Sequence, residues 1–401
     1  MYCLKTYLTT GYIGYQDAEC FLHMGMDSFA GVRENVRGGG AMGRKAVIAM
    51  SGGVDSGVAA YLIKEQGYDC MGITMKLFHN EDIGVSKEHS CCSLDDVEDA
   101  RSVAYALDIP YHVFNFSERF QEDVIDRFIA AYENGMTPNP CIDCNRYLKF
   151  DKLYHRAEEI GYDYVVTGHY ARIEWDAISG RYLLKKAVDG GKDQSYVLYS
   201  MTQEQLAHTL FPLGGMKKEK VREIARAKGF VNAQKHDSQD ICFVQEGHYF
   251  DFMEQYTGKS YPEGDFIDQE GNVIGRHRGI IRYTVGQRRG LGISGPEPMY
   301  VCAVDPSANT VTLGKKQELF STSLTAGNVN LISVPRIEGA VRLKAKVRYR
   351  QAEQPATVMQ TGEGTLNVAF DEPQRAITKG QSVVLYDGDI VVGGGVIQRV
   401  G

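Results

Sequence analysis

The feature that most constrains the fold is a glycine-containing turn between two apolar segments. Residues 46–50 form an apolar run typical of a buried strand, and residues 58–63 continue as a helical segment that Gly67 would end. The turn between them reads Ser51, Gly52, Gly53, Val54, Asp55 and Ser56. Glycines let backbone N–H groups approach an anion closely, and a helix N-terminus adds the positive end of its dipole. Since the serine hydroxyls add further donors, the turn predicts a phosphate site.

The alternative interpretation is an ordinary strand-to-helix turn, in which Gly, Ser and Asp are common. The turn also lacks the Lys-Ser/Thr pair that closes the phosphate loop of kinases and GTPases. It instead resembles the loop of the ATP pyrophosphatase superfamily, whose members cleave ATP between the α and β phosphates and adenylate a substrate. That resemblance implies nucleotide chemistry without naming a substrate.

Composition favours a cytoplasmic protein of two or three domains. The chain has 401 residues, of which 43% are hydrophobic and 24% charged, as in ordinary globular proteins. No apolar run approaches the length of a membrane span, and no signal peptide is visible. Nine cysteines at unpatterned positions fit a reducing compartment. A net charge of −7 gives no general attraction to nucleic acid, so such binding would need local basic patches.

The hydrophobic patterns along the sequence predict an α/β protein with a C-terminal β domain. Residues 1–43 lack periodicity, and we expect a disordered extension or a start codon placed upstream of Met42. Residues 44–245 alternate strand and helix patterns, which predicts a Rossmann-like parallel sheet with helices on both faces and ligands at the carboxyl ends of its strands. Residues 246–300 are rich in Gly and Arg and are predicted to form a small central domain. Residues 301–401 carry short alternating strands that predict a β-barrel.

Two further stretches place cysteines in polar surroundings. In residues 137–146 two prolines predict a rigid loop without helix, and a helix is expected from about residue 146. Cys144 then lies just before a helix N-terminus, close to Arg146 and Lys149, which predicts a lowered pKa and a nucleophilic thiol. Cys242 lies in the polar stretch 236–243. A structural zinc site would need two more ligands, for which Cys91 and Cys92 are the alternative.

Six motifs, in order along the chain, carry a specific resemblance. They are A-M-S-G-G-V-D-S, T-P-N-P-x-x-x-C-N, T-G-H-Y-A-R, K-D-Q-S-Y, H-D-S-Q-D-I-C-F and Y-T-V-G-Q-R-R-G-L-G. Together they resemble the tRNA-specific 2-thiouridylases, which replace the 2-oxygen of the wobble uridine with sulfur. The resemblance extends from Arg44 to the glycines at 393–395. It also implies that the terminal barrel is similar to domain 2 of elongation factor Tu.

The resemblance implies roles for particular residues. Cys144 matches the catalytic nucleophile, and Cys242 matches the cysteine that carries a persulfide. The expected ATP site comprises Ala49, Met50, Ser51, Gly52, Gly53, Val54, Asp55, Ser56, Met75 and Gly168. The expected tRNA contacts are Asn139, Pro140, Cys141, His169, Lys192, Asp193, Gln194, Arg348, Tyr349 and Gln381.

One position departs from the family's pattern. Many members have Asp where this chain has Cys141, and that Asp is a proposed acid/base. Either Asp143 takes its place, or proton transfer needs no side chain there. Cys141, Cys144 and Cys242 also permit a rival in which three thiolates hold an iron–sulfur cluster with one open iron site.

The implied reaction is ATP- and Mg²⁺-dependent 2-thiolation of tRNA, through adenylation of the uracil 2-oxygen and sulfur transfer from Cys242. It ends with a Cys144–Cys242 disulfide that must be reduced. The resemblance suggests tRNAs for Lys, Glu and Gln as substrates, with a cysteine desulfurase or a relay protein as sulfur donor. Alternatives are another adenylating enzyme of the superfamily, such as an amide-forming ligase, and a tRNA-binding or iron–sulfur regulatory protein that has lost activity.

Two basic segments are candidates for contact with tRNA phosphates. From Arg342 to Arg350 the cations recur at every second position, which on a strand places five of them on one face. The alternative is a solvated face of the barrel. The second segment contains Arg276, His277, Arg278, Arg282, Arg288 and Arg289. Tyr283 within it is interpreted equally as a base-stacking residue or a core residue.

Overall fold

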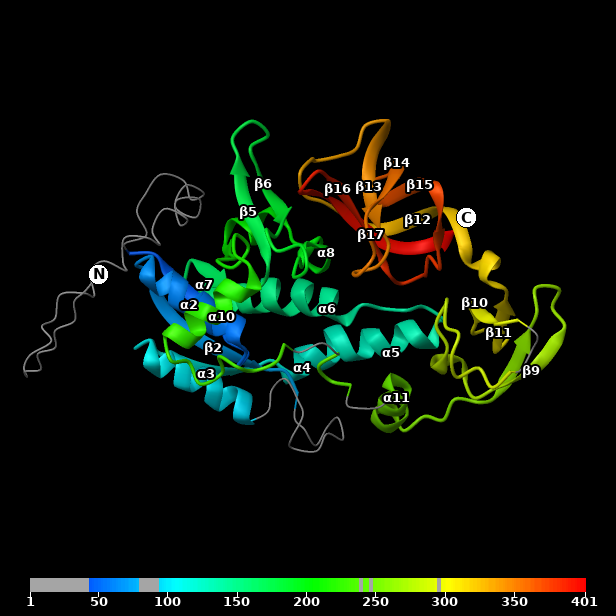
Figure 1. Cartoon of the computed structure of the whole chain (residues 1–401), viewed down its shortest axis with the longest axis horizontal. Helices are drawn as coiled ribbons and strands as arrows, with labels where there is room; N and C mark the ends of the chain where they lie inside the picture. The colour runs from blue at the N-terminus through cyan, green and yellow to red at the C-terminus, as the bar shows by residue number, and fades with distance from the viewer. Residues whose placement is uncertain (1–42, 79–93, 238–240, 245–247, 294–296) are drawn as a thin grey trace, which may run out of the picture. The chain divides into compact units, whose positions relative to one another are not determined.

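The computed structural model describes residues 43–78, 94–237, 241–244, 248–293 and 297–401. The predicted N-terminal extension falls, apart from Gly43, on residues 1–42 and so lies outside the described residues, as do Cys91 and Cys92 of the zinc alternative. Contacts group Ala41–Gly401 into one compact unit. Figure 1 follows this unit along the chain, from β1 in blue to the barrel strands in orange and red.

The first part of the unit is built on a parallel sheet with strand order β3-β2-β1-β4-β7. Its strands are β1 (Lys45–Ala49), β2 (Asp69–Lys76), β3 (Tyr111–Asn115), β4 (Tyr164–Val166) and β7 (Thr209–Leu210). The chain builds outward from β1 to β3, then returns to place β4 on the other side of β1. In open α/β sheets this switch point is where the carboxyl ends of adjacent strands leave room for a ligand.

Helices cover both faces of this sheet, as the alternation of strand and helix patterns predicted. Ala46 and Ile48 of β1 belong to one hydrophobic cluster, whereas Val47 between them belongs to another. The first cluster takes residues from α2 (Val54–Glu65), α3 (Leu94–Ala106) and α10 (Lys218–Ala227). The second takes residues from the helices between β3 and β4. Successive strand side chains point to opposite faces, so the buried apolar run Ala46–Ile48 of β1 needs both layers.

Two helices of the second layer contain π-helical stretches. The first runs through α4 (Ser117–Phe120), η2 (Gln121–Ile125) and α5 (Asp126–Glu133). The second runs through α6 (Pro140–Asp143), η3 (Cys144–Lys152) and α7 (Leu153–Glu159). The expected start near residue 146 was therefore wrong. Pro140 occupies the first helical position, where its missing N–H costs nothing and its ring presets a helical φ.

Further elements complete the chain between β4 and the barrel. They are β5 (Ala171–Asp176), β6 (Arg181–Lys186), α8 (Ser195–Leu198), α9 (Gln203–Ala207), α11 (Tyr249–Thr257) and η4 (Ile280–Arg282). A second sheet has strand order β10-β11-β8-β9, from β8 (Gly264–Ile267), β9 (Val273–His277), β10 (Tyr300–Asp305) and β11 (Thr310–Gly314). The boundary expected at 300/301 cuts through this sheet. The alternating pattern of β10 and β11 could not reveal that they pair with β8 and β9 rather than with the barrel.

The C-terminal part is a closed β-barrel, as predicted. Its strands follow the order β12-β15-β14-β13-β16-β17, and β12 pairs with β17 to close it. They are β12 (Phe320–Leu331), preceded by η5 (Lys316–Leu319), then β13 (Ala340–Lys346), β14 (Gln354–Gly362), β15 (Thr365–Arg375), β16 (Ser382–Asp387) and β17 (Ile390–Val400). Closure leaves the barrel interior to a hydrophobic cluster that includes Val358, Leu366 and Leu385.

The barrel is joined to the first part of the chain through the hairpin β5–β6. Ile390 of β17 pairs with Lys185 of β6, which extends the barrel sheet by the hairpin. Buried tyrosines add to this junction, because the Tyr196 hydroxyl donates to the Ser382 carbonyl at 2.8 Å. The Ser382 hydroxyl in turn donates to the Tyr199 hydroxyl oxygen at 3.1 Å. The hydrogen bonds of this junction lie among side chains that are almost wholly buried.

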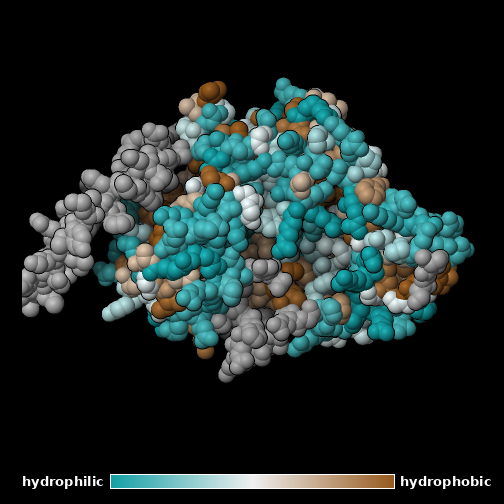
Figure 2. Space-filling model, in the orientation of Figure 1, coloured by the Kyte–Doolittle hydropathy of each residue, from teal (hydrophilic) through white to brown (hydrophobic). Residues whose placement is uncertain are grey.

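The described surface is mainly polar. Figure 2 shows one face of the molecule, on which hydrophilic residues predominate and hydrophobic residues form separate patches. Ile178, in the turn between β5 and β6, is an exposed apolar side chain of the kind found singly on many proteins. Within the described residues, no helix combines the length and the apolar character that crossing a bilayer requires.

Gly394 of β17 offers a test of how tightly the junction is packed. A Cβ at this position would clash with the Val383 carbonyl oxygen and lie 2.8 Å from the Tyr199 ring. We expect Gly394→Ala to lower the free energy of unfolding by about 1–3 kcal/mol, the usual cost of overpacking. Chemical denaturation measures it. Gly364→Ala is the matched control, since no atom lies within 4 Å of its added Cβ; equal stability of the two variants would contradict tight packing.

Candidate functional site

The glycine turn lies directly after β1, at the switch point of the sheet. Gly52 has a φ of +75°, a conformation that L side chains rarely adopt. A Cβ there would also lie 2.7 Å from the Cα of Asp96. Ser56 braces the turn from within: its hydroxyl donates to the Gly53 carbonyl at 2.9 Å and accepts from the Ser51 N–H at 3.2 Å. Gly52 is therefore required by both conformation and space.

Gly168, which follows β4, packs against the same turn. A Cβ on Gly168 would lie 2.8 Å from the Asp55 carbonyl carbon and 2.9 Å from the Ser56 nitrogen. The structure thus brings together two segments that are more than a hundred residues apart in sequence and that were both predicted to bind ATP. Their meeting at the carboxyl ends of β1 and β4 is the arrangement expected for a nucleotide site in this kind of sheet.

Two more of the predicted nucleotide residues, Met50 and Met75, lie at the carboxyl ends of β1 and β2. Met50 is 2% exposed, and its carbonyl accepts a hydrogen bond of 2.6 Å from the Thr74 hydroxyl. Met75 follows Thr74 near the end of β2 and is buried in the second hydrophobic cluster. Both backbone groups of Met50 are engaged within the protein, since its N–H donates to the Ile73 carbonyl at 2.7 Å. Thr74 was not singled out from the sequence.

Cys144 and Cys242 lie against one apolar cluster. Both pack on the second hydrophobic cluster, which contains Phe120, Phe128 and Phe243. Cys144 is the first residue of η3, and Cys242 precedes Phe243, whose ring is 5.3 Å from that of Phe128. π-Helical segments occur often at functional sites. The two cysteines that were predicted to react thus pack on the same hydrophobic cluster.

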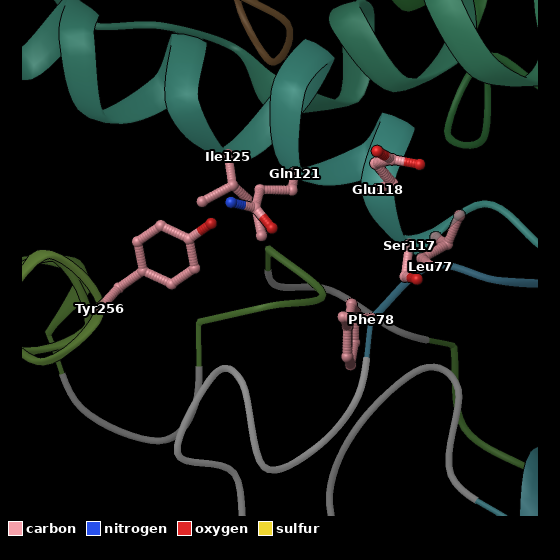
Figure 3. A pocket seen from close by; sticks show the side chains of 7 residues that line it. All are labelled: Leu77, Phe78, Ser117, Glu118, Gln121, Ile125 and Tyr256. Atoms are coloured by element: carbon pink, nitrogen blue, oxygen red, sulfur yellow. The ribbon is translucent and has the colours of Figure 1, made fainter.

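A cavity lies beside this cluster. It measures about 180 Å³ and is lined by Leu77, Phe78, Ser117, Glu118, Gln121, Ile125 and Tyr256. Figure 3 shows that its lining comes from the two residues after β2, from α4 and η2, and from α11. The Phe78 ring is 5.8 Å from Phe120, which is 5.6 Å from Phe243 beside Cys242. The cavity and Cys242 therefore share an aromatic wall.

Asp143 stands immediately before Cys144 with an altered acidity. Burial raises the pKa of its carboxyl to about 6, although the guanidinium groups of Arg127 and Arg146 oppose the rise. Asp123 adds a smaller upward effect. A carboxyl with a pKa near neutral can both give and accept a proton, which is the property that Asp143 needs to replace the Asp that many family members have at the position of Cys141. Cys141 itself is exposed on α6.

Several predicted tRNA contacts make internal contacts in this structure. Lys192 donates to Asp237 at 2.7 Å, Asp193 accepts from the Ala187 and Ser195 N–H groups, and Gln194 accepts from the Tyr170 N–H. His169 is 8% exposed, and burial, followed by the charge of Lys149, lowers its pKa well below the usual value. Its ring nitrogen lies 2.7 Å from the Thr167 hydroxyl. Their contact with tRNA stays a prediction.

The barrel residues predicted to touch tRNA also hold parts of the chain together. Arg348 donates to the carbonyls of Val285 and Ala376 at 3.2 and 2.8 Å. Gln381 donates to the carbonyls of Thr137 and Pro138, directly before Asn139. Tyr349 keeps 37% of its surface exposed. Gln381 therefore connects the barrel to the segment expected to touch the target base.

The predicted basic strand is shorter than expected. β13 ends at Lys346, so Arg348 and Arg350 lie in the following turn rather than on a five-cation face. Arg342 pairs with Asp371, and burial lowers the pKa of Lys346, whose ammonium lies 5.8 Å from the centre of the Tyr386 ring. Alternation in sequence could not show where pairing with β14 and β16 stops.

The second basic segment divides into paired and exposed cations. Arg276 pairs with Asp265, and Arg282 pairs with Glu254. His277 is fully buried, and Tyr283 packs in the core of the central sheet, which decides between its two interpretations. Arg278, Arg288 and Arg289 are exposed and form no ion pair with another described residue.

The structure also assigns importance to residues that the sequence did not suggest. Lys218 is 5% exposed and donates to both carboxylate oxygens of Asp55, at 2.8 and 2.7 Å. Asn232 donates to the Gly52 carbonyl at 2.9 Å. The one signal for Lys218 was its position at the start of α10, where a cation opposes the helix dipole.

The possible metal ligands are the His, Cys, Asp and Glu side chains of the described ranges. No three His, Cys, Asp or Glu side chains there converge in a group that could hold a metal ion, and Cys141, Cys144 and Cys242 are all among the residues described. The iron–sulfur alternative stays a prediction.

The parallel sheet, the phosphate-type turn at its switch point and the two following β domains define a nucleotide-binding protein of the HUP class. Family models match three ranges: a tRNA methyl transferase HUP domain over residues 44–246, a tRNA methyl transferase PRC-barrel domain over 250–315, and an aminomethyltransferase beta-barrel domain over 321–397. The chain belongs to the family of tRNA-specific 2-thiouridylases. The resemblance read from its six motifs is confirmed.

Named relatives support this assignment over nearly the whole chain. The tRNA-specific 2-thiouridylase MnmA of Clostridioides difficile (strain 630) is 54% identical over 89% of this chain and 99% of its own. That of Acetivibrio thermocellus is 51% identical over 88% and 99%. Among solved structures, a 4-thiouridine synthetase–RNA complex with bound ATP is similar at 21% identity and a TM-score of 0.35, covering 54% of this chain and 51% of its own.

Gly168→Ala tests the contact between β4 and the glycine turn. The added Cβ would press on the backbone of Asp55 and Ser56, neither of which can yield without moving the turn. We expect binding of a non-hydrolysable ATP analogue, measured by calorimetry, to weaken at least about tenfold, or about 1.4 kcal/mol. Gly190→Ala, where no atom lies within 4 Å of the added Cβ, is the control. Unchanged affinity in Gly168→Ala would place the nucleotide elsewhere.

Proposed function

We propose that this protein catalyses ATP-dependent 2-thiolation of the wobble uridine of tRNA. Two observations support the proposal: the glycine turn contacts Gly168 at the switch point, and Cys144 and Cys242 both pack on one core cluster. Membership of the thiouridylase family gives the reaction its substrate class. Methyl transfer, which the family-model description mentions, has no use for two reactive cysteines.

The first half of the reaction activates the uracil. A carbonyl oxygen is a poor leaving group, so its direct replacement by sulfur is slow. The 2-oxygen attacks the α-phosphorus of MgATP, pyrophosphate leaves, and the oxygen becomes part of an AMP leaving group. Backbone N–H groups of the turn and the start of α2 are suited to hold the β- and γ-phosphates as charge develops on them. Mg²⁺ bound with ATP would neutralise part of that charge.

The second half transfers sulfur. The terminal sulfur of a Cys242 persulfide attacks the activated carbon, and AMP leaves with the former carbonyl oxygen. The Cys144 thiolate then attacks the inner sulfur, which releases the thiolated base and forms a Cys144–Cys242 disulfide. In the alternative route Cys144 attacks first and releases sulfide, which attacks the carbon. Either route ends with a disulfide that an external dithiol reduces by two electrons.

The tRNA surface is proposed to include the exposed cations that the fold leaves uncommitted. Lys344 and Arg350 of the barrel, with Arg278, Arg288 and Arg289 of the central domain, are exposed and form no ion pair with another described residue. Such side chains can neutralise phosphates without first breaking an internal pair. The wobble base would then leave the anticodon stack to reach the nucleotide site. The tRNAs for Lys, Glu and Gln, and a cysteine desulfurase or relay protein as donor, belong to this proposal.

Nucleoside mass spectrometry tests the reaction directly. Unmodified tRNA is incubated with the enzyme, ATP, Mg²⁺ and a sulfur source, and 2-thiouridine is quantified. We expect Cys144→Ser and Cys242→Ser to abolish product. Cys302→Ser should retain wild-type rate, because the contacts of Cys302, with the Tyr300 carbonyl and the Gln269 side chain, lie in and beside the central sheet. Wild-type product from either of the first two variants would refute the cysteine chemistry, and ATP turnover without thiolation would favour an adenylating ligase.

The acidity of Asp143 gives a pH prediction. Its carboxyl is protonated below a pKa of about 6, so a reaction that needs the carboxylate should slow as the pH falls through that value. In Asp143→Asn we expect this limb to vanish and the rate to fall by about 10²–10⁴, the usual contribution of a general acid or base. The charged groups facing it, Arg127, Arg146 and Asp123, are kept unchanged.

Stability provides an independent check on Asp143. Because the folded pKa of about 6 lies above the usual value, the folded state holds the proton more strongly. The stability from this site is therefore complete below the unfolded pKa, near about 4, and is lost as the pH rises through 6. Asp143→Asn should remove this loss, whereas Asp151→Asn, on η3, should keep it. A rate limb near pH 6 that persists in Asp143→Asn would exclude Asp143 as the acid/base.

A further inference from the structure

One buried cation is shared between the nucleotide turn and the segment that leads to Cys242. The Lys218 ammonium lies 2.7 Å from an oxygen of Asp55, in the first turn of α2, and 2.7 Å from an oxygen of Asp237. The Lys218 side chain is 7% exposed. The two carboxylates come from motifs predicted for different half-reactions, the first for ATP binding and the second for sulfur transfer.

Asp237 is held by further cations. Its carboxylate accepts from Lys192 at 2.7 Å and from Arg222 at 3.0 Å. Burial alone would raise its pKa, but hydrogen bonds from Lys192 and Lys218, together with their charges, bring it down to about 2. Asp237 is therefore ionised throughout the physiological range, and its position depends on these cations.

The residues before Asp237 are tied to the turn as well. Asn232 donates to the Gly52 carbonyl, and its own Oδ1 is buried without a hydrogen-bond partner among the described residues. Lys235 donates to Asp96 and Asp99 of α3 at 2.6 Å each. Asp96 is the residue whose backbone abuts Gly52. A shift of the turn would therefore act on residues 232–237 through several contacts.

In sequence, Cys242 lies between Asp237, which is held by ion pairs, and Phe243, which is held by aromatic contacts. Residues 238–240 are outside the described part, and the chain resumes at 241–244. Phe243 is 1% exposed, with its ring 5.6 Å from Phe120 and 5.3 Å from Phe252. Phe243 is part of the cluster on which Cys144 packs. Asp237 is instead connected through Lys218 to Asp55 at the glycine turn.

We propose that Lys218 and Asp237 are positioning residues that couple occupancy of the nucleotide turn to the position of Cys242. This inference rests on the proposed function, since it assigns ATP to the turn and sulfur transfer to Cys242. Lys218 is the shared element: it cannot change its distance to Asp55 without changing its contact with Asp237. Sulfur would then be presented only when nucleotide is bound.

The physical cause is competition for one cation. Without nucleotide, Lys218 is shared between the carboxylates of Asp55 and Asp237, and Lys192 and Arg222 add positive charge beside Asp237. Phosphates at the turn add negative charge beside Asp55, so Lys218 has a further anion to balance in a poorly solvated site, where Coulomb interactions are strong. The Lys218 ammonium is attracted toward the turn, and its ion pair with Asp237 weakens.

This competition predicts effects of opposite sign at the two ends of one ion pair. Asp237→Asn removes a competitor for Lys218, so a non-hydrolysable ATP analogue with a methylene bridge between the α and β phosphates should bind more tightly. Lys218→Met leaves the Asp55 carboxylate unbalanced beside the phosphates, so the same analogue should bind more weakly. We expect changes on the order of fivefold in Kd. A purely structural role would weaken binding in both variants.

The second measurement follows Cys242 itself. Its alkylation by iodoacetamide is timed by peptide mass spectrometry with and without the analogue, and Cys302 serves as the internal reference. In the wild type the analogue should speed alkylation of Cys242 by about threefold or more, of the size of a typical coupling between sites. In Asp237→Asn the rate should be high already and insensitive to the analogue. Asp237→Glu should restore part of the response.

Controls separate the inference from the function on which it rests. Lys220→Met, on the same helix, removes an exposed pair with Glu223 and should leave Kd and alkylation unchanged. If Lys218→Met does not fold, Asp237→Asn still decides the question, since its side chain is partly exposed and its shape is kept. Nucleotide binding with no effect on Cys242, or the same effect in Asp237→Asn, overturns the coupling alone. Failure of the wild type to bind the analogue overturns the proposed function as well.

Discussion

The contact on which the site depends is the one between two backbones at the carboxyl edge of the parallel sheet. Gly168, after β4, lies so close to Asp55 and Ser56, after β1, that a single added methyl group has no room. The sheet order places β4 beside β1, and the absence of a side chain lets their loops meet. A ligand at the turn therefore binds at the switch point, where the strand order of the sheet reverses. The N-terminus of α2 points to the same place.

Around that contact, several charged side chains form ion pairs and hydrogen bonds within the protein. Lys192 and Lys218 converge on Asp237, and Arg348 binds main-chain carbonyls of two different segments. Buried or half-buried cations of this kind set the positions of loops, because moving one would leave an unpaired charge in a poorly solvated place. Exposed cations without an ion pair to another described residue are also found, among them Lys344 and Arg350 of the barrel.

Particular elements show how far the sequence could be interpreted. The turn at residues 51–56, the alternation of strands and helices and the closed barrel were predicted, since each depends on local spacing and periodicity. Pro140 was misjudged, because proline forbids the interior of a helix but favours its first position. The strands β10 and β11 were assigned to the barrel, because an alternating pattern predicts a strand without naming its partners. Lys218 gave only the weak signal of a cation at a helix start.

The sequence by itself determined the glycine turn predicted to bind phosphate, the two cysteines predicted to react and the family of the chain, since motif spacing and residue chemistry are present directly in the chain. Only the tertiary structure decided which of these parts act together. It brought Gly168 to the turn, placed Cys144 and Cys242 on one apolar cluster, and gave Asp55 and Asp237 a single lysine to share. The reason is physical: burial and charge pairing depend on distances in space, which residues far apart in sequence acquire only when the chain has folded.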